Sequence, residues 1–156
     1  MTDAAPQSDW LRAVRVYVVA SLALHLLWEF VQLPLYTLWT TASFREQAFA
    51  VVHCTAGDGM IAGLSLLLAL MIAGSPAWPA RAWVPVWLSV LVIGTGYTVY
   101  SEWLNVHVRQ SWAYSALMPT LPPLGTGLSP LLQWLIVPTL ALHIARGTPG
   151  SPSLSP

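Results

Sequence analysis

The chain has 156 residues, of which 56% are hydrophobic and only 8% are charged, and its six basic residues balance its six acidic ones. Soluble domains carry about 25% charged residues, so this composition excludes an ordinary soluble domain and indicates an integral membrane protein. The zero net charge gives no sign of a nucleic-acid partner, and the single cysteine, Cys54, excludes an intramolecular disulfide.

Four apolar segments follow one another along the chain, at residues 14–40, 47–73, 82–105 and 128–146. Each is long enough to cross about 30 Å of hydrocarbon at about 1.5 Å per residue. Pro34 should kink the first helix or mark its approach to the membrane surface. We therefore predict an all-α fold, in which residues 1–146 form a single four-helix transmembrane domain and residues 147–156 form a disordered tail.

The positions of the arginines predict the orientation of this bundle. Four of the six lie at one end of the predicted helices, and Arg45 and Arg109 lie at the other. Because basic residues are enriched on the cytoplasmic side, we expect a multi-pass protein of a bacterial inner membrane with both termini in the cytoplasm. Residues 106–127 then form a long outer loop between helices three and four, and their aromatic and proline content predicts an ordered cap or a partly re-entrant segment.

Polar and ionisable side chains gather in one half of the predicted bilayer, where their burial is costly and marks a candidate functional site. On the first helix, His25, Glu29 and Gln32 share one face at spacings i, i+4 and i+7. The later helices bring further polar or aromatic residues to a similar depth: Asp58, then Glu102 and Asn105, then Gln133 and Trp134. Three acids at one depth predict a pocket, because simple structural hydrogen bonding would bury like charges together.

Two choices within this set depend on helix geometry and on ordinary packing. His53 and Asp58 point about 140° apart on an ideal helix, so both cannot face the pocket squarely, and we favour Asp58. Gln133 and Asn105 are equally explained as groups that hydrogen-bond one helix to another.

A pocket of acids and a histidine suits proton transfer to and from an apolar substrate, because one acid can be held protonated while its neighbour acts as a base. A carbocation formed by protonating an alkene would be stabilised by a tryptophan face, for which Trp28, Trp103 and Trp134 are candidates. We expect Trp112 and Tyr114, with Met118, to fold down from the outer loop and exclude water.

The order of the polar positions supports this chemistry through a family resemblance. The positions are H-L-L-W-E from His25 to Glu29, the acid Asp58, Y-T-V-Y-S-E from Tyr97 to Glu102, and Gln133 and Trp134 followed by Pro138. This order resembles the EXPERA, or emopamil-binding-protein, family of sterol isomerases. The resemblance implies a sterol or isoprenoid pocket in which His25 and Glu29 handle the proton, a second acid is Asp58 or Glu102, and Trp134 lies beside the cation. The pair Trp28 and Glu29 is also similar to the tryptophan and glutamate of integral-membrane terpene cyclases, which use two buried acids.

We therefore predict isomerisation or cyclisation of a sterol or isoprenoid lipid, with no cofactor and no metal, and with membrane lipids and a lipophilic small molecule as partners. The predicted acid/base groups are Glu29, His25, Asp58 and Glu102. The predicted substrate contacts are Trp28, Gln32, Asn105, Trp112, Tyr114, Met118, Gln133 and Trp134. Two alternatives stay open: a metal- or haem-binding membrane protein for transport or electron transfer, with His107 among its ligands, and a noncatalytic lipid-binding protein.

Overall fold

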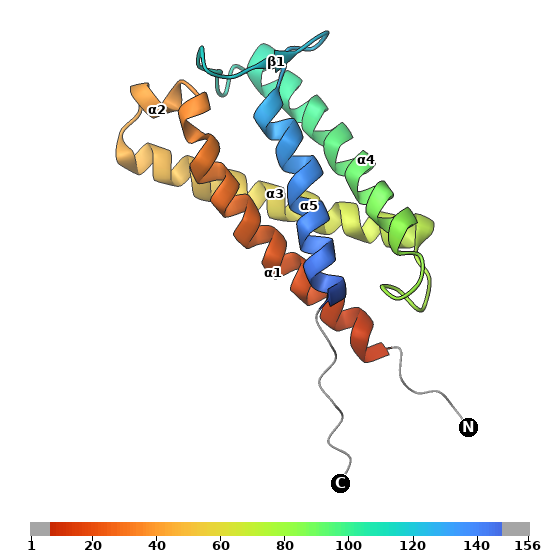
Figure 1. The fold of residues 1–156 in the computed structure, drawn as a ribbon. Coiled ribbons are helices and arrows are strands. Elements are labelled where there is room, and N and C mark those ends of the chain that lie inside the picture. Colours follow the sequence, from red (N-terminus) through yellow and green to blue (C-terminus); the bar gives the residue numbers. More distant parts are fainter. Residues whose placement is uncertain (1–6, 148–156) are drawn as a thin grey trace, which may run out of the picture.

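A computed structural model describes residues 7–147 and consists mainly of four long helices (Figure 1). These helices are α1 (Gln7–Gln32), α3 (Phe44–Ala73), α4 (Trp83–Trp103) and α5 (Leu128–Gly147). Four helical segments of the described chain are long and apolar enough to cross a membrane. The predicted all-α fold with four membrane-spanning helices is confirmed, and it supports an integral, multi-pass membrane protein.

The four helices form a closed ring of contacts. The helices α1 and α4 each pack against both α3 and α5. The beginning of α1 and the end of α5 lie at the same end of the bundle, and α3 runs at a large angle to the other three helices (Figure 1). The end farther from these two positions carries the connections from α1 to α3 and from α4 to α5, and it is the end at which the predicted site residues lie.

Small side chains allow the helices to approach closely, as in other membrane bundles. Ala62 and Ala69 on α3 and Ala141 on α5 are fully buried in the core. A Cβ atom added to Gly94 would lie 2.2 Å from the Trp134 ring, so the absence of a side chain on α4 makes room for that indole. This close approach of α4 and α5 fixes Trp134 at the edge of the candidate site.

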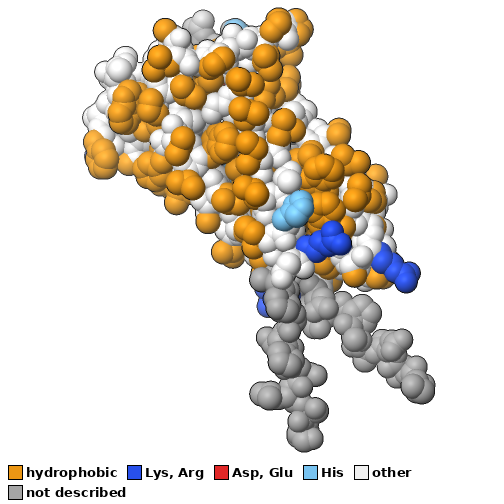
Figure 2. Space-filling view, in the orientation of Figure 1, with side chains coloured by type: hydrophobic (Ala, Val, Ile, Leu, Met, Phe, Trp, Pro, Cys, Tyr) orange, Lys and Arg blue, Asp and Glu red, His pale blue; other side chains and the backbone are white. Residues whose placement is uncertain are grey.

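The outer surface of the bundle is apolar. Hydrophobic side chains cover most of the face in Figure 2, and the basic side chains in view gather at the end where α1 begins and α5 ends. Large apolar residues such as Val31, Phe49, Met71 and Val92 are well exposed. In a membrane protein such residues face lipid, so exposure of these side chains is consistent with four membrane-spanning helices.

The boundaries of the first two predicted helices differ from the structure. The first helix begins at Gln7 and ends at Gln32, whereas residue 40 was predicted as its end. Pro34 lies in a 3₁₀ turn (η1, Leu33–Leu35), and a separate short helix follows (α2, Leu38–Thr41). Proline at this point lacks the N–H that a continuing α-helix needs, so it ends α1 rather than bending it.

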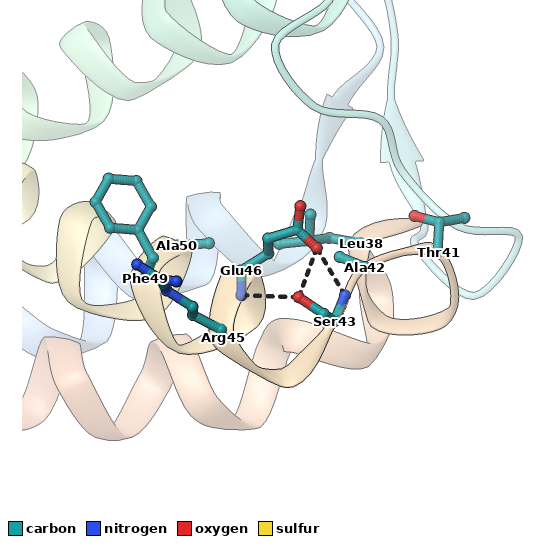
Figure 3. A pocket seen from close by; sticks show the side chains of 8 residues that line it. All are labelled: Leu38, Thr41, Ala42, Ser43, Arg45, Glu46, Phe49 and Ala50. Carbon is teal, nitrogen blue, oxygen red and sulfur yellow. Dashed lines mark hydrogen bonds between the residues drawn. The ribbon is translucent and has the colours of Figure 1, made fainter.

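The next helix, α3, begins three residues before its predicted start. Ser43 Oγ accepts a hydrogen bond from the backbone N–H of Glu46, and the Glu46 carboxylate accepts one from the backbone N–H of Ser43 at 2.8 Å (Figure 3). This reciprocal capping box satisfies two amide groups that would otherwise lack a partner and fixes Phe44 as the first helical residue.

The predicted ordered loop between α4 and α5 is also confirmed. A π-helical turn (η2, Leu104–Val108) extends α4, and a small hairpin pairs β1 (Thr120–Leu121) with β2 (Thr126–Gly127). The loop is bonded to the segment after α1: Thr37 donates its backbone N–H to Ala113 at 3.0 Å, and Ser115 donates its own to Leu35 at 2.9 Å. The predicted disordered tail, apart from Gly147 at the end of α5, lies outside the described residues.

Candidate functional site

The side-chain amide of Gln133 on α5 connects polar groups from α1 and α3. Its nitrogen, Nε2, lies 2.9 Å from His25 Nδ1 and 3.1 Å from Glu29 Oε1. The same nitrogen lies 2.9 Å from Asp58 Oδ2, and the amide oxygen accepts from Gln32 Nε2 at 3.3 Å. We call His25, Glu29, Gln32, Asp58 and Gln133 the amide cluster. His25 is 0% exposed and Glu29 is 9% exposed, so the cluster is a buried polar centre within the apolar bundle.

The number of protons in this cluster is constrained by its geometry. A neutral amide nitrogen carries two hydrogens, but three acceptor atoms surround the Gln133 nitrogen. His25 Nδ1 also lies 3.4 Å from Asp58 Oδ2, within reach of an N–H to carboxylate contact. If the neutral His25 ring carries its hydrogen on Nδ1, that nitrogen donates to Asp58 and the two amide hydrogens serve Glu29 and Asp58, so the set is satisfied without a further proton.

A chain of hydrogen bonds holds Glu29 from the side that faces α5. Gln32 donates to Glu29 Oε1 at 2.7 Å and accepts from Ser129 Oγ at 2.9 Å. Trp28 Nε1 donates to the same Ser129 hydroxyl at 3.1 Å. These bonds fix the carboxyl of Glu29 in one orientation, and they give Trp28 and Gln32 a positioning role behind the acid.

Glu102 belongs to a second polar group at the same end of the bundle. Its carboxylate accepts a hydrogen bond from the phenol of Tyr114, and the phenol oxygen in turn accepts from the backbone N–H of Gly127 at 2.9 Å. Burial, and then the neighbouring carboxylate, raise the pKa of Tyr114 above its usual value, so the phenol stays protonated and acts as a donor. The outer loop therefore carries the partner of a buried acid on α4.

A cavity of about 580 Å³ lies between these two polar groups. All three predicted acids line it, together with four of the other predicted residues: Asn105, Trp112, Gln133 and Trp134. Its remaining lining is largely apolar and includes Leu33, Leu38, Val51 and Ile61. The structure thus brings acids from α1, α3 and α4 to one space, as the polar spacing of the sequence predicts.

The other predicted residues lie behind the cavity. Trp28 and Gln32 support Glu29, Tyr114 supports Glu102, and Met118 is buried within the loop. His25 is also set back: its ring centroid lies 5.2 Å from that of Trp134, and its Nε2 has no hydrogen-bond partner among residues 7–147. These residues hold or cover the groups that face the cavity.

The two candidates on α3 differ in their surroundings. Asp58 is half-buried and enters the amide cluster, whereas His53 is exposed and stacks on Phe49 with ring centroids 5.6 Å apart. Both residues contribute to the cavity lining, with His53 at its exposed margin.

Several residues of the cavity wall have no counterpart among the sequence predictions. Tyr36, Cys54, Ser111 and Arg109 all line it. Cys54 reads as an apolar filler in the sequence, and Tyr36 as an interfacial aromatic. The sequence offers one signal, at Arg109. This basic residue follows Asn105 by four residues, and it lies at the end of the predicted bundle that has few arginines.

A metal ion would need several His, Cys, Asp or Glu side chains that converge on one point. No three His, Cys, Asp or Glu side chains within residues 7–147 are arranged to hold a metal ion. His107 lies apart from the acids, with Nε2 3.0 Å from the backbone oxygen of Leu124. The remaining histidine, His143, contacts Trp83 near the other end of the bundle.

Comparisons of the chain with protein-family models, with curated proteins and with solved structures found no match. The functional conclusion therefore depends on the geometry of the two polar groups and the cavity between them.

Proposed function

We propose that this membrane protein binds a sterol or isoprenoid lipid in the cavity and isomerises or cyclises it by acid/base catalysis. The observation that carries the proposal is the position of Glu29 and Asp58, which share one buried amide and both line a cavity whose surface is largely apolar. An apolar substrate in this cavity would meet two ionisable groups that a buried amide holds in place, as proton transfer to and from carbon needs.

The proposed reaction balances without an oxidant or a reductant. A protonated carboxyl gives its proton to one carbon of an alkene: the O–H bond breaks, and the π electrons form a C–H bond and leave a cation on the neighbouring carbon. A carboxylate then removes a proton from another carbon, whose C–H electrons form a new double bond. Attack of a second alkene on the cation before this proton loss gives a ring instead.

The surrounding residues have distinct roles in this proposal. Glu29, Asp58 and Glu102 line the cavity from α1, α3 and α4. The Trp134 face stabilises the cation by an attraction of about 2 kcal/mol when desolvated. His25 contacts Trp134 and Asp58 but does not line the cavity, so it is a positioning residue.

The size and lining of the cavity support a lipid rather than a small polar substrate. A volume of about 580 Å³ lies within the range of about 300 to 1,000 Å³ that is usual for ligand pockets. Its largely apolar lining matches a hydrocarbon skeleton, and its few polar groups would meet the reacting carbons.

The arginine distribution supports a cytoplasmic location for both termini. Arg12, Arg15, Arg81 and Arg146 lie near the helix ends at which α1 begins, α4 begins and α5 ends. Reporter fusions at residues 44 and 115 should both read as external, because the opposite ends of the helices carry only Arg45 and Arg109. A cytoplasmic signal at either fusion would contradict this orientation.

The proposed function is tested by comparing the wild-type protein with Glu29→Gln and with Glu46→Gln as a matched control. Both changes convert a carboxyl into an amide, but Glu46 caps α3 and does not line the cavity. We expect all three proteins to retain the same lipids after extraction in mild detergent. Only Glu29→Gln should fail to convert them.

Mass spectrometry separates the alternatives. A retained lipid that the wild-type protein never converts would identify a binding protein and contradict catalysis. A stoichiometric metal in the purified protein would favour the metal- or haem-binding alternative.

A further inference from the structure

The two arginines at the loop end of the bundle both line hollows. Arg109 lines the cavity that contains the acids, and Arg45 lines an adjoining hollow on the outer side of α2 and α3 (Figure 3). The two spaces share Leu38, Phe49 and Ala50 in their walls. Since arginines concentrate on the opposite side of a membrane protein, a basic residue beside the acids calls for a local explanation.

The backbone holds Arg109 at the cavity by a tight reversal of the chain. Arg109 follows the π-helical turn η2 and donates its backbone N–H to Leu104 at 2.8 Å. Gln110 then adopts a left-handed conformation with φ of 53°, which is uncommon for a residue other than glycine. Ser111 closes the turn by donating its N–H to Asn105 at 2.9 Å. The reversal keeps Arg109, Ser111 and Asn105 in the wall of one cavity.

The charge of Arg109 is not neutralised within the described part of the chain. The ion-pair contact found among residues 7–147 joins His25 to Asp58, and Arg109 has no such contact. The nearby acids already have partners, since Glu29 and Asp58 share the Gln133 amide and Glu102 accepts from Tyr114. Arg109 is exposed, whereas Gln133 and Trp134 are buried, so the cavity has a basic mouth and an acidic, aromatic interior.

We propose that the lipid carries an anionic headgroup, a phosphate or a carboxylate, which binds Arg109 at this mouth. This inference rests on the proposed function, in which the same cavity takes an isoprenoid lipid. A guanidinium donates two parallel hydrogen bonds to such an anion, and the Ser111 hydroxyl adds a further donor. Repulsion from Glu29, Asp58 and Glu102 keeps the headgroup at the mouth. Its hydrocarbon chain then extends inward toward Trp134 and the acids, and binding the head fixes which double bond reaches them.

Arg45 provides a matched control for this proposal. It has the same charge, lies at the same end of the bundle and is likewise exposed, but it lines only the adjoining hollow. General attraction of an anion to the basic groups at this end would depend on both arginines equally. A headgroup site in the cavity depends on Arg109 alone.

The test is a binding measurement on the full chain in nanodiscs of phosphatidylcholine, with empty nanodiscs as the background. The probes are geranylgeranyl phosphate, geranylgeraniol and inorganic phosphate, and the proteins are wild type, Arg109→Gln and Arg45→Gln. We expect wild type to bind the lipid phosphate at least about tenfold more tightly than the alcohol. Arg109→Gln should reduce this preference to within twofold, and Arg45→Gln should keep it.

Each other outcome has a definite meaning. Equal affinity of wild type for the two lipids, or an equal loss in both variants, would overturn the headgroup site. Displacement of the lipid phosphate by an equal concentration of inorganic phosphate would identify a free-phosphate site and overturn it too. Binding of the alcohol without preference leaves the proposed function intact, whereas binding of neither lipid by wild type contradicts the proposed function itself.

A second variant keeps the test decisive if Arg109→Gln does not fold. Arg109→Lys retains the charge but loses the planar fork, so the preference for the phosphate should fall to an intermediate value. An unchanged preference in a folded Arg109→Lys protein would exclude the guanidinium as the headgroup contact.

Discussion

Replacing Gln133 by leucine should loosen the contact of α5 with α1 and α3. The change keeps a similar volume but removes an amide that hydrogen-bonds four side chains on those two helices. Hydrogen bonds between membrane helices contribute about 0.6 kcal/mol each on average and about 1.7 kcal/mol at most. The expected loss in the free energy of unfolding is therefore about 2 kcal/mol, and two buried carboxyls left without their shared donor add to it.

The matched control is Asn105→Leu, which also replaces an amide by leucine. Asn105 donates only to the backbone oxygen and hydroxyl of Ser101 on the same stretch of helix, so its loss should cost less than about 0.5 kcal/mol. Both variants are compared with wild type by reversible unfolding in mixed micelles with increasing dodecyl sulfate, followed by tryptophan fluorescence. If Gln133→Leu unfolds at the same denaturant fraction as Asn105→Leu, the Gln133 amide does not join the helices and the description of the cluster is refuted.

Two further predictions concern the residues that frame the cavity. Gly94→Ala should lower the free energy of unfolding by about 1 to 3 kcal/mol and shift the tryptophan emission, because its Cβ would lie 2.2 Å from the Trp134 ring. In the control Gly96→Ala, the added Cβ meets nothing within 4 Å, so stability and emission should both stay unchanged. Equal effects of the two variants would contradict this packing. Tyr114→Phe removes the donor to Glu102 and should speed amide hydrogen exchange in residues 110–118. Since burial raises the pKa of Tyr114 above its usual value of 10.0, the folded state favours the neutral phenol. The contribution of this phenol to the free energy of unfolding is therefore full below pH 10 and falls as the pH rises above 10. Unfolding between pH 8 and pH 11 should show a smaller decline in Tyr114→Phe than in wild type, and an identical decline would contradict the assignment.

The number of helices and the grouping of polar residues on shared helix faces could be predicted because both depend on local sequence. Apolar length determines whether a segment can cross the membrane, and the spacing of His25, Glu29 and Gln32 places them on one face of any α-helix. All three indeed belong to one hydrogen-bonded cluster.

The end of α1 was harder to predict, because residues 35–39 are as apolar as the helix that precedes them. Apolar composition cannot separate a continuing span from a short helix at the membrane surface. The helix ends at the 3₁₀ turn that contains Pro34, and two backbone hydrogen bonds, from Thr37 to Ala113 and from Ser115 to Leu35, join the segment after it to the distant loop between α4 and α5.

The division of the acids into two groups depends on how each helix is rotated about its own axis. That rotation follows from side-chain packing, such as the fit of Trp134 against Gly94, which periodicity alone does not specify. The same holds for Gln133, which the sequence presents as a substrate contact or as interhelical bonding and which does connect α5 with α1 and α3. The turn that places Arg109 at the cavity depends on a left-handed Gln110, a conformation with no signal in the sequence.

Deuterium incorporation tests the central claim, proton transfer from a buried carboxyl to a lipid carbon, most directly. The exchangeable proton of Glu29 equilibrates with solvent, so wild-type protein in D₂O should convert its co-purified lipid into a product that carries one carbon-bound deuterium per turnover. Glu29→Gln should give no labelled product, and Glu46→Gln should match wild type. A product formed by wild type without deuterium, or equal labelling by Glu29→Gln, would contradict proton transfer at Glu29.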